Sequence, residues 1–376
     1  MLVDESGTRL DDLRRAFHRD RKRWTLTFCQ TAAEALEHVR RHPTDVIVSA
    51  MPEESSMDDS LYETARVVRP SAARILLTGA QDPRRIMLVQ RAAHQVLTGA
   101  SGPDEIRAAI ERLASSRRDI PDEQLRSIVN DVRVLPTPSD VQRRLSDVLS
   151  RRHDLVDVAE VIETDVALTA ELLRLVNSSF FGLAHSVATV REAVGLLGLE
   201  LVEATVAARS AFSEHLAIPI DVGAINRHSQ NVAGVAGLVA ASGGVSKLDR
   251  SLAVSAGLLH DIGVLVLAQL TPRGAGDAAE VLAVEDLDAE RLAFGVDRFT
   301  VGAHLLDVWG FSSRTPTTIR ELQAPIRSVG AGTVGWSLRV AHHAVVAHGV
   351  LPPTDDDHRE WFDQIVAIER ELLVAV

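Results

Sequence analysis

The chain has 376 residues, of which 46% are hydrophobic, and its formal net charge at pH 7 is −12. This acidic balance argues against a nucleic-acid or anionic-membrane surface, because phosphate groups are bound by clustered Lys and Arg. The single cysteine, Cys29, excludes a disulfide framework and a CxxC metal site. Charged or polar residues interrupt every apolar run before about 18 positions, so no membrane-spanning helix is expected. The start, MLVDES, lacks a signal-peptide pattern, and we expect a cytoplasmic protein.

Residues 1–114 alternate short β-branched runs with amphipathic stretches. Five runs predict strands, at residues 2–3, 25–28, 45–49, 74–78 and 95–98. Stretches such as 31–41 and 103–114 have helical periodicity. Strands that alternate with helices form a parallel sheet with helices on both faces. We therefore predict a five-stranded parallel α/β domain of the flavodoxin-like class over residues 1–114.

A short charged stretch with a proline, SSRRDIPDE at 115–123, is predicted to be a linker. Residues 124–376 show no strand pattern. Apolar spacing of 3.6 residues instead predicts helices at 139–150, 154–163, 166–177, 188–213, 222–241, 249–270 and 298–309. This region is therefore expected to be an all-α domain of packed helices. A C-terminal helical extension around 354–364 is expected to dock through Trp361 and Phe362.

The first domain resembles the receiver domain of bacterial response regulators over its whole length. Asp4 and Glu5 follow the first strand, where that family keeps an acidic Mg²⁺-binding pair, and Thr78 matches its conserved hydroxyl. The phosphoacceptor aspartate of the family corresponds to Ala50, which has no oxygen nucleophile, and Gly99 replaces the family's lysine. The resemblance implies a degenerate receiver that is not phosphorylated. Asp4 and Glu5 are then either a residual cation site or a solvated acidic loop.

Residues 131–213 resemble the HDOD family, an output domain related to the HD phosphohydrolases, and the resemblance continues to about residue 325. It is carried by LPTPSDVQRRLSDVLS, ETDVALTAELLRLVNSSFFG, ATVREAVGLLGLELV, RHSQNVAG and LLHDIGVLVL. The resemblance implies an all-α HDOD domain over residues 124–376 that acts by binding other signalling proteins, including kinases and cyclic-dinucleotide enzymes.

The stretch LLHDIG contains an adjacent His260 and Asp261 in an apolar helical run. Burying both groups is costly without partners, and a metal ion would satisfy both. In catalytic HD enzymes a histidine precedes this doublet and an aspartate follows it. His228 fits the first position, whereas His342 stands at the last, and Arg298 stands where a two-metal relative has a histidine. The candidate metal ligands are therefore His228, His260 and Asp261, which are either a vestigial metal site or a buried polar group.

The sequence thus predicts a non-enzymatic bacterial signal-transduction protein, in which a phosphorylation-independent receiver is coupled to an HDOD interaction domain. No catalytic residue is expected, and no cofactor beyond a divalent metal at the residual site. One alternative is a metal-dependent phosphohydrolase or phosphodiesterase acting on a nucleotide. Another is a nucleotide-binding sensor without turnover, with phosphate contacts at Arg227, Arg298 and Arg320. We expect the partners to be other signalling proteins, and we expect no binding to nucleic acid or to a membrane. A homodimer is left open. The remaining histidines are expected on the surface or in helix packing: His304, His343 and His348.

Overall fold

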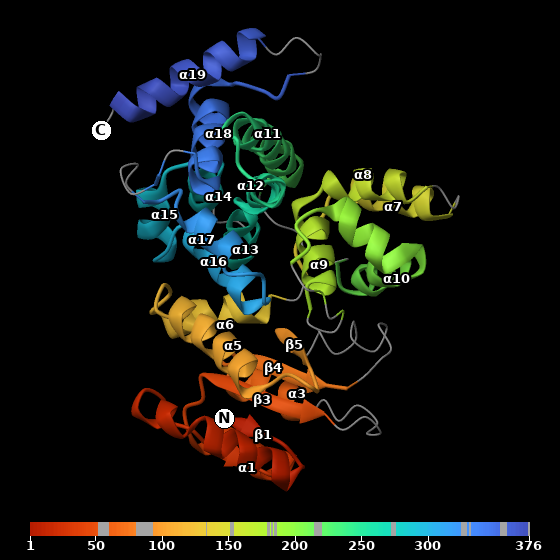
Figure 1. Ribbon diagram of the computed structural model, residues 1–376, viewed down its shortest axis with the longest axis vertical. Coiled ribbons are helices and arrows are strands. Elements are labelled where there is room, and N and C mark those ends of the chain that lie inside the picture. The colour runs from red at the N-terminus through yellow and green to blue at the C-terminus, as the bar shows by residue number, and fades with distance from the viewer. Residues whose placement is uncertain are drawn as a thin grey trace. The chain divides into compact units, whose positions relative to one another are not determined.

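The computed structural model describes residues 1–51, 60–79, 93–132, 134–150, 154–178, 181, 183, 186–213, 220–271, 276–324, 329–330, 332–353 and 359–374. The chain divides into two compact units, drawn in Figure 1. The first contains Met1–Arg133, Asn177–Ser186 and His304–Phe311. The second contains Val134–Val176, Val187–Ala303 and Ser312–Val376. The stretch 115–123, which we expected as a linker, belongs to the first unit.

The first unit is built on a five-stranded parallel sheet in the order β2-β1-β3-β4-β5, and β1, β3, β4 and β5 are labelled in Figure 1. The strands are β1 (Leu2–Val3), β2 (Phe28–Cys29), β3 (Val46–Met51), β4 (Ala73–Thr78) and β5 (Gln95–Thr98). This strand order is the one found in flavodoxin-like folds. The predicted fold class is therefore confirmed. Of the predicted run 25–28, only Phe28 lies in the strand.

Helices join the strands of this sheet. They are α1 (Gly7–Ala16), η1 (His18–Lys22), α2 (Ala32–Arg41), α3 (Ser60–Val68), α5 (Pro103–Ser116) and α6 (Glu123–Asp131). Because parallel crossovers are right-handed, a strand order that reverses direction places helices on both faces. One buried cluster joins β1 and β2 to α2 and α3 through Val3, Cys29, Ala35 and Leu61. Cys29 is a buried core residue, as predicted.

The first unit also includes the end of helix α16 (Arg298–Val308). The side-chain amide of Gln95 in β5 donates to the backbone carbonyl of Asp307, with an N···O distance of 2.8 Å. Nδ1 of His304 lies 2.8 Å from the hydroxyl oxygen of Ser116 in α5. His304 is buried, so it is a helix-packing residue rather than a surface one.

Within the part of the second unit that the structure describes, every regular element is a helix, as predicted. Besides the first residues of α16, the helices are α7 (Ser139–Ser150), α8 (Leu155–Glu163), α9 (Val166–Val176), α10 (Val190–Ser213), α11 (Val222–Ser242), α12 (Lys247–Leu259), α13 (Ile262–Leu270), α14 (Gly276–Ala283), α15 (Leu287–Phe294), α17 (Arg314–Arg320), α18 (Val334–His348) and α19 (Arg359–Val374). Two long predicted helices are interrupted. Gly198 bends α10 with a positive φ of 73°, and His260–Asp261 separates α12 from α13.

The core of the second unit gathers α11, α12, α18 and α19. Its cluster of buried side chains includes Trp336 of α18 and Trp361 of α19, and Phe362 packs against it. The indole N–H of Trp361 donates to the carbonyl of Leu351 at 2.9 Å. The C-terminal helix therefore docks through its aromatic residues, as predicted, and residues 354–358 of the predicted stretch lie outside the described residues.

Among the described residues, one helical stretch, Lys247–Leu270, is long and apolar enough to cross a membrane. The share of its most apolar window that is buried inside the structure is 83%. Burial of this extent is typical of a core helix, and α12 indeed packs against α11 and α18.

Candidate functional site

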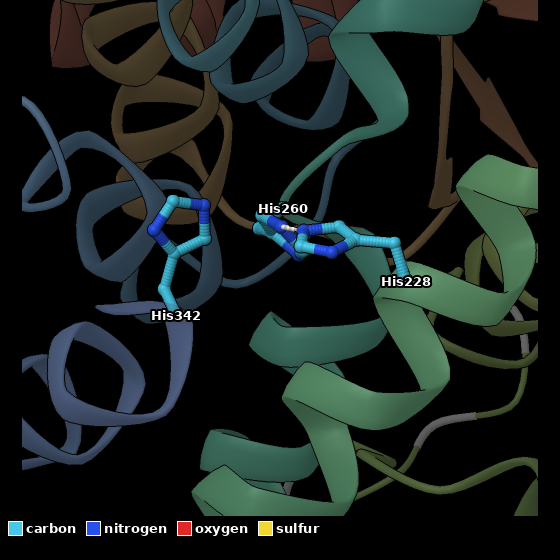
Figure 2. A group of neighbouring side chains, drawn as sticks. All are labelled: His228, His260 and His342. Atoms are coloured by element: carbon cyan, nitrogen blue, oxygen red, sulfur yellow. Dashed lines mark hydrogen bonds between the residues drawn. The ribbon is translucent and has the colours of Figure 1, made fainter. Parts of the chain in front are cut away.

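The His–Asp doublet lies at the junction of α12 and α13. His260 is the C-cap of α12, and Asp261 precedes α13. Helix α11 approaches α12 closely, since a Cβ atom on Gly257 would lie 2.6 Å from the Cα of Ala233. This small-residue contact brings His228 of α11 against the doublet. The Nε2 atoms of His228 and His260 lie 3.2 Å apart (Figure 2).

Both ring nitrogens of His260 are engaged by the protein. Nδ1 lies 2.7 Å from the backbone carbonyl of Gly257, and because a carbonyl only accepts, Nδ1 carries the proton. The lone pair of His260 is then on Nε2, facing His228. Burial lowers the pKa of His260 to about 4, and burial also lowers the pKa of His228. Both imidazoles are therefore neutral at pH 7.

Asp261 supplies a negative charge beside these imidazoles. One carboxylate oxygen lies 3.6 Å from Nε2 of His260 and 3.7 Å from Nε2 of His228. The other lies 3.7 Å from the guanidinium of Arg298. Burial would raise the pKa of Asp261, but the neighbouring His260, Arg298 and His228 outweigh it and lower the pKa to about 2. The carboxylate is therefore ionised although Asp261 is buried.

Arg298 is paired with a fully buried carboxylate, Glu290 of α15. Its Nε donates to one oxygen of Glu290 at 2.5 Å, and its backbone N–H donates to the other oxygen at 2.7 Å. Burial would lower the pKa of Arg298, but Asp261 and Glu290 raise it, so the guanidinium stays protonated. The positive charge of Arg298, which stands where a two-metal relative has a histidine, thus has its own counter-charge. The same pairing occupies the guanidinium that the nucleotide-sensor alternative assigns to phosphate.

A third imidazole, His342 of α18, completes the cluster. One ring nitrogen from each of His228, His260 and His342 lies within 4.8 Å of the other two. Nε2 of His342 also lies 3.2 Å from a carboxylate oxygen of Glu285. Burial would raise the pKa of Glu285, but its contact with His342 lowers it. The centroid of the buried Phe299 ring lies 5.7 Å from that of the His342 ring, and the two rings meet edge to face.

The donor set fits a metal ion of the zinc class. Three imidazoles converge, and Oδ1 of Asp261 accepts no hydrogen bond from the described residues. Imidazole nitrogen is a preferred ligand of Zn²⁺, and carboxylates outnumber guanidinium groups around the cluster. The ion would be held by His228, His260 and His342, with Asp261 beside them. When bound, such an ion supplies Lewis acidity and lowers the pKa of a coordinated water.

The predicted ligands His228, His260 and Asp261 are thus close together, and metal binding stays a prediction. His342, which stands where HD enzymes have an aspartate, joins them. The cluster also has two acidic neighbours that the sequence did not single out, Glu285 and Glu290. A buried arginine demands a carboxylate partner. The need of Arg298 for a carboxylate could have indicated Glu290 from the sequence, but several other acidic residues nearby in the sequence could supply that carboxylate equally well.

In the first unit, Ala50 lies in β3 opposite Leu77 of β4. Thr78 ends β4, opposite Met51, and is buried. The acidic pair is divided. Asp4 is buried, accepts a hydrogen bond from the backbone N–H of Ser6 at 2.9 Å and lies 3.4 Å from Nε of Arg9, whereas Glu5 is exposed. A protein cation therefore already lies beside Asp4, which weighs against a residual Mg²⁺ site there.

The HDOD domain family matches residues 135–325. The chain belongs to the HDOD family. Its HDOD domain contains the whole doublet region, including His228, His260 and Asp261, and it follows the five-stranded α/β domain along the sequence. His342 lies beyond the matched residues.

Solved structures resemble this HDOD protein. The MmoQ response regulator from Methylococcus capsulatus is 26% identical with a TM-score of 0.50, over 64% of this chain and 93% of that one. A virulence factor from Campylobacter jejuni is 20% identical with a TM-score of 0.48, over 67% and 91% of the two chains. An HDOD domain protein with unknown function from Geobacter sulfurreducens is 23% identical with a TM-score of 0.35, again over 67% and 91%. No curated protein matches the chain.

Proposed function

We propose that this HDOD protein is a non-enzymatic signal-transduction protein. Its receiver-like domain works without phosphorylation, and its HDOD domain binds other signalling proteins, of which kinases and cyclic-dinucleotide enzymes are the proposed classes. A homodimer is one form in which it could do so. Family membership supports this proposal, as does the likeness to a structure named as a response regulator.

The burial and the contacts of His260 are the observation that supports a non-enzymatic function. A catalytic imidazole needs a nitrogen that reaches substrate or a reacting water. His260 is fully buried, and its two ring nitrogens contact the carbonyl of Gly257 and the ring of His228. Val264, one helical turn after His260, is a buried apolar side chain and offers no group that could contact a phosphate. Recognition by surface contacts is the task that such a domain can still perform.

The receiver-like domain supports the same proposal. Ala50 stands at the position of the phosphoacceptor, and a methyl group cannot form an acyl phosphate. A signal must then reach this domain by binding, which shifts the population of a conformation rather than adding charge.

A second candidate function is a metal-dependent phosphohydrolase. The convergence of His228, His260 and His342 favours it, because three protein ligands and an open position are what a hydrolytic zinc site requires.

A phosphodiesterase assay separates the two candidates. The protein is incubated with cyclic dinucleotides and with bis(p-nitrophenyl) phosphate, in the presence of Zn²⁺, Mn²⁺ or Ni²⁺, beside the His260→Gln variant. We expect the same blank rate from both proteins. Turnover by the wild type that disappears in His260→Gln would establish the enzyme and overturn the non-enzymatic proposal.

A further inference from the structure

A second group of metal-ligating side chains lies between α18 and α19. It consists of His343 and His348 of α18 and Glu371 of α19. Residues 342 and 343 are neighbours on a helix, so their side chains project about 100° apart. His342 faces the buried histidine cluster, and His343 faces α19. The two groups are therefore separate sites on one helix.

The geometry of this outer group suits a transition-metal ion. Nε2 of His348 lies 3.4 Å from one carboxylate oxygen of Glu371, and Nε2 of His343 lies 4.0 Å from the other. The two imidazole rings meet edge to face, with centroids 5.2 Å apart. Ligands about 2.1 Å from a tetrahedral ion lie about 3.4 Å from one another. The distances between the donor atoms are thus already close to those of ligands that share one metal ion.

The environment leaves these donors available. Nε2 of His343 is buried and has no hydrogen-bond partner among the described residues. His348 and Glu371 are exposed, so an ion can enter from solvent and keep water in its open position. Arg339 lies one turn before His343 and carries a positive charge. Its guanidinium donates to the backbone carbonyls of Leu322 and Ala324 at 2.8 and 2.5 Å.

We propose that His343, His348 and Glu371 form a binding site for a zinc-class divalent ion that fastens α19 to the end of α18. Two imidazoles and one carboxylate are a ligand set that Zn²⁺ takes in proteins. The site would add an ion-dependent link to the contacts that already hold α19. Those contacts include the buried Trp361 and the indole N–H of Trp336, which donates to Glu369 at 3.3 Å. Zinc would thereby set how firmly the C-terminal helix is docked.

Zinc titration of the full chain tests this site. The protein carries no histidine tag, is stripped with EDTA and desalted, and Zn²⁺ binding is measured by calorimetry. Two exposed ligands are replaced singly, His348→Ala and Glu371→Gln. The matched control is Glu360→Gln, an exposed carboxylate of α19 about 16 Å along the helix from Glu371. His228→Ala serves as a second control, because it removes a ligand of the buried cluster only.

We expect one zinc ion to bind to the wild type, to Glu360→Gln and to His228→Ala with the same affinity at this site. Its affinity should fall more than tenfold in His348→Ala and in Glu371→Gln, since even partners outside the coordination shell are worth about 10–100-fold. Hydrogen exchange of α19 should slow on adding Zn²⁺ in the wild type and not in His348→Ala. Zinc binding that survives in both exposed variants, or that only His228→Ala removes, would assign the ion elsewhere and overturn the proposal.

Discussion

Removal of the Asp261 carboxylate is the sharpest test of the buried cluster. The change Asp261→Ala leaves His228, His260 and Arg298 without the negative charge that lies 3.6–3.7 Å from each of them. The side chain forms no capping hydrogen bond with the described backbone of α13. The loss of stability is therefore electrostatic, together with the cavity that a smaller residue leaves.

The expected magnitude follows from the contact with Arg298. Two unit charges 3.7 Å apart interact by about 4.5 kcal/mol at an effective dielectric constant of about 20. Arg298 keeps Glu290 as a partner, so only part of this energy is lost. We expect the free energy of unfolding to fall by about 3 kcal/mol in Asp261→Ala. Asp261→Asn keeps the volume and a polar oxygen, and should cost about 2 kcal/mol.

The assay is urea unfolding with and without EDTA, in a His348→Ala background that removes the outer zinc candidate. The control is Asp288→Ala, an exposed carboxylate of α15 whose loss should cost less than about 0.5 kcal/mol. We expect EDTA to change neither wild-type nor variant curves. A wild-type curve that shifts to lower urea in EDTA, with no such shift in either Asp261 variant, would show that a bound metal and not the polar cluster provides the stability.

Three further outcomes are expected. The free energy of unfolding should fall by about 2 kcal/mol from pH 7 to pH 5, because burial depresses the pKa of His260 to about 4 whereas the unfolded chain takes up this proton near pH 6.5. Urea unfolding of the wild type and of His260→Gln at several pH values checks this. The same dependence of unfolding free energy on pH in both proteins would contradict it. Gly263→Ala should cost about 2 kcal/mol, since the new Cβ would lie 1.9 Å from the carbonyl oxygen of Arg298, whereas Gly195→Ala, with no described atom within 4 Å, should cost nothing in the same melts. Acetyl phosphate should leave the intact mass unchanged because Ala50 offers no nucleophile, and a hydroxylamine-labile phosphate adduct would refute this.

The two fold classes could be predicted from the sequence because they depend on local periodicity. Short β-branched runs between amphipathic stretches predicted the parallel sheet, and the strands Val46–Met51, Ala73–Thr78 and Gln95–Thr98 follow them closely. Apolar spacing predicted most helices of the second unit to within a few residues. Interruptions were missed where they depend on single residues. The bend at Gly198 requires a backbone conformation that periodicity does not reveal, and the separation of α12 from α13 falls inside a continuous apolar run.

The candidate site divides in the same way. The doublet His260–Asp261 was evident from the sequence, since two polar groups in an apolar run require partners wherever the chain folds. Only the tertiary structure shows which residues those partners are. His228, His342 and Arg298 lie on three other helices, and Glu285 and Glu290 approach from around α15. These contacts depend on how closely helices pack, which is set by small residues such as Gly257 and Gly263. The distance between two packed helices depends on the surfaces of both, so it cannot be read from the apolar pattern of either segment alone.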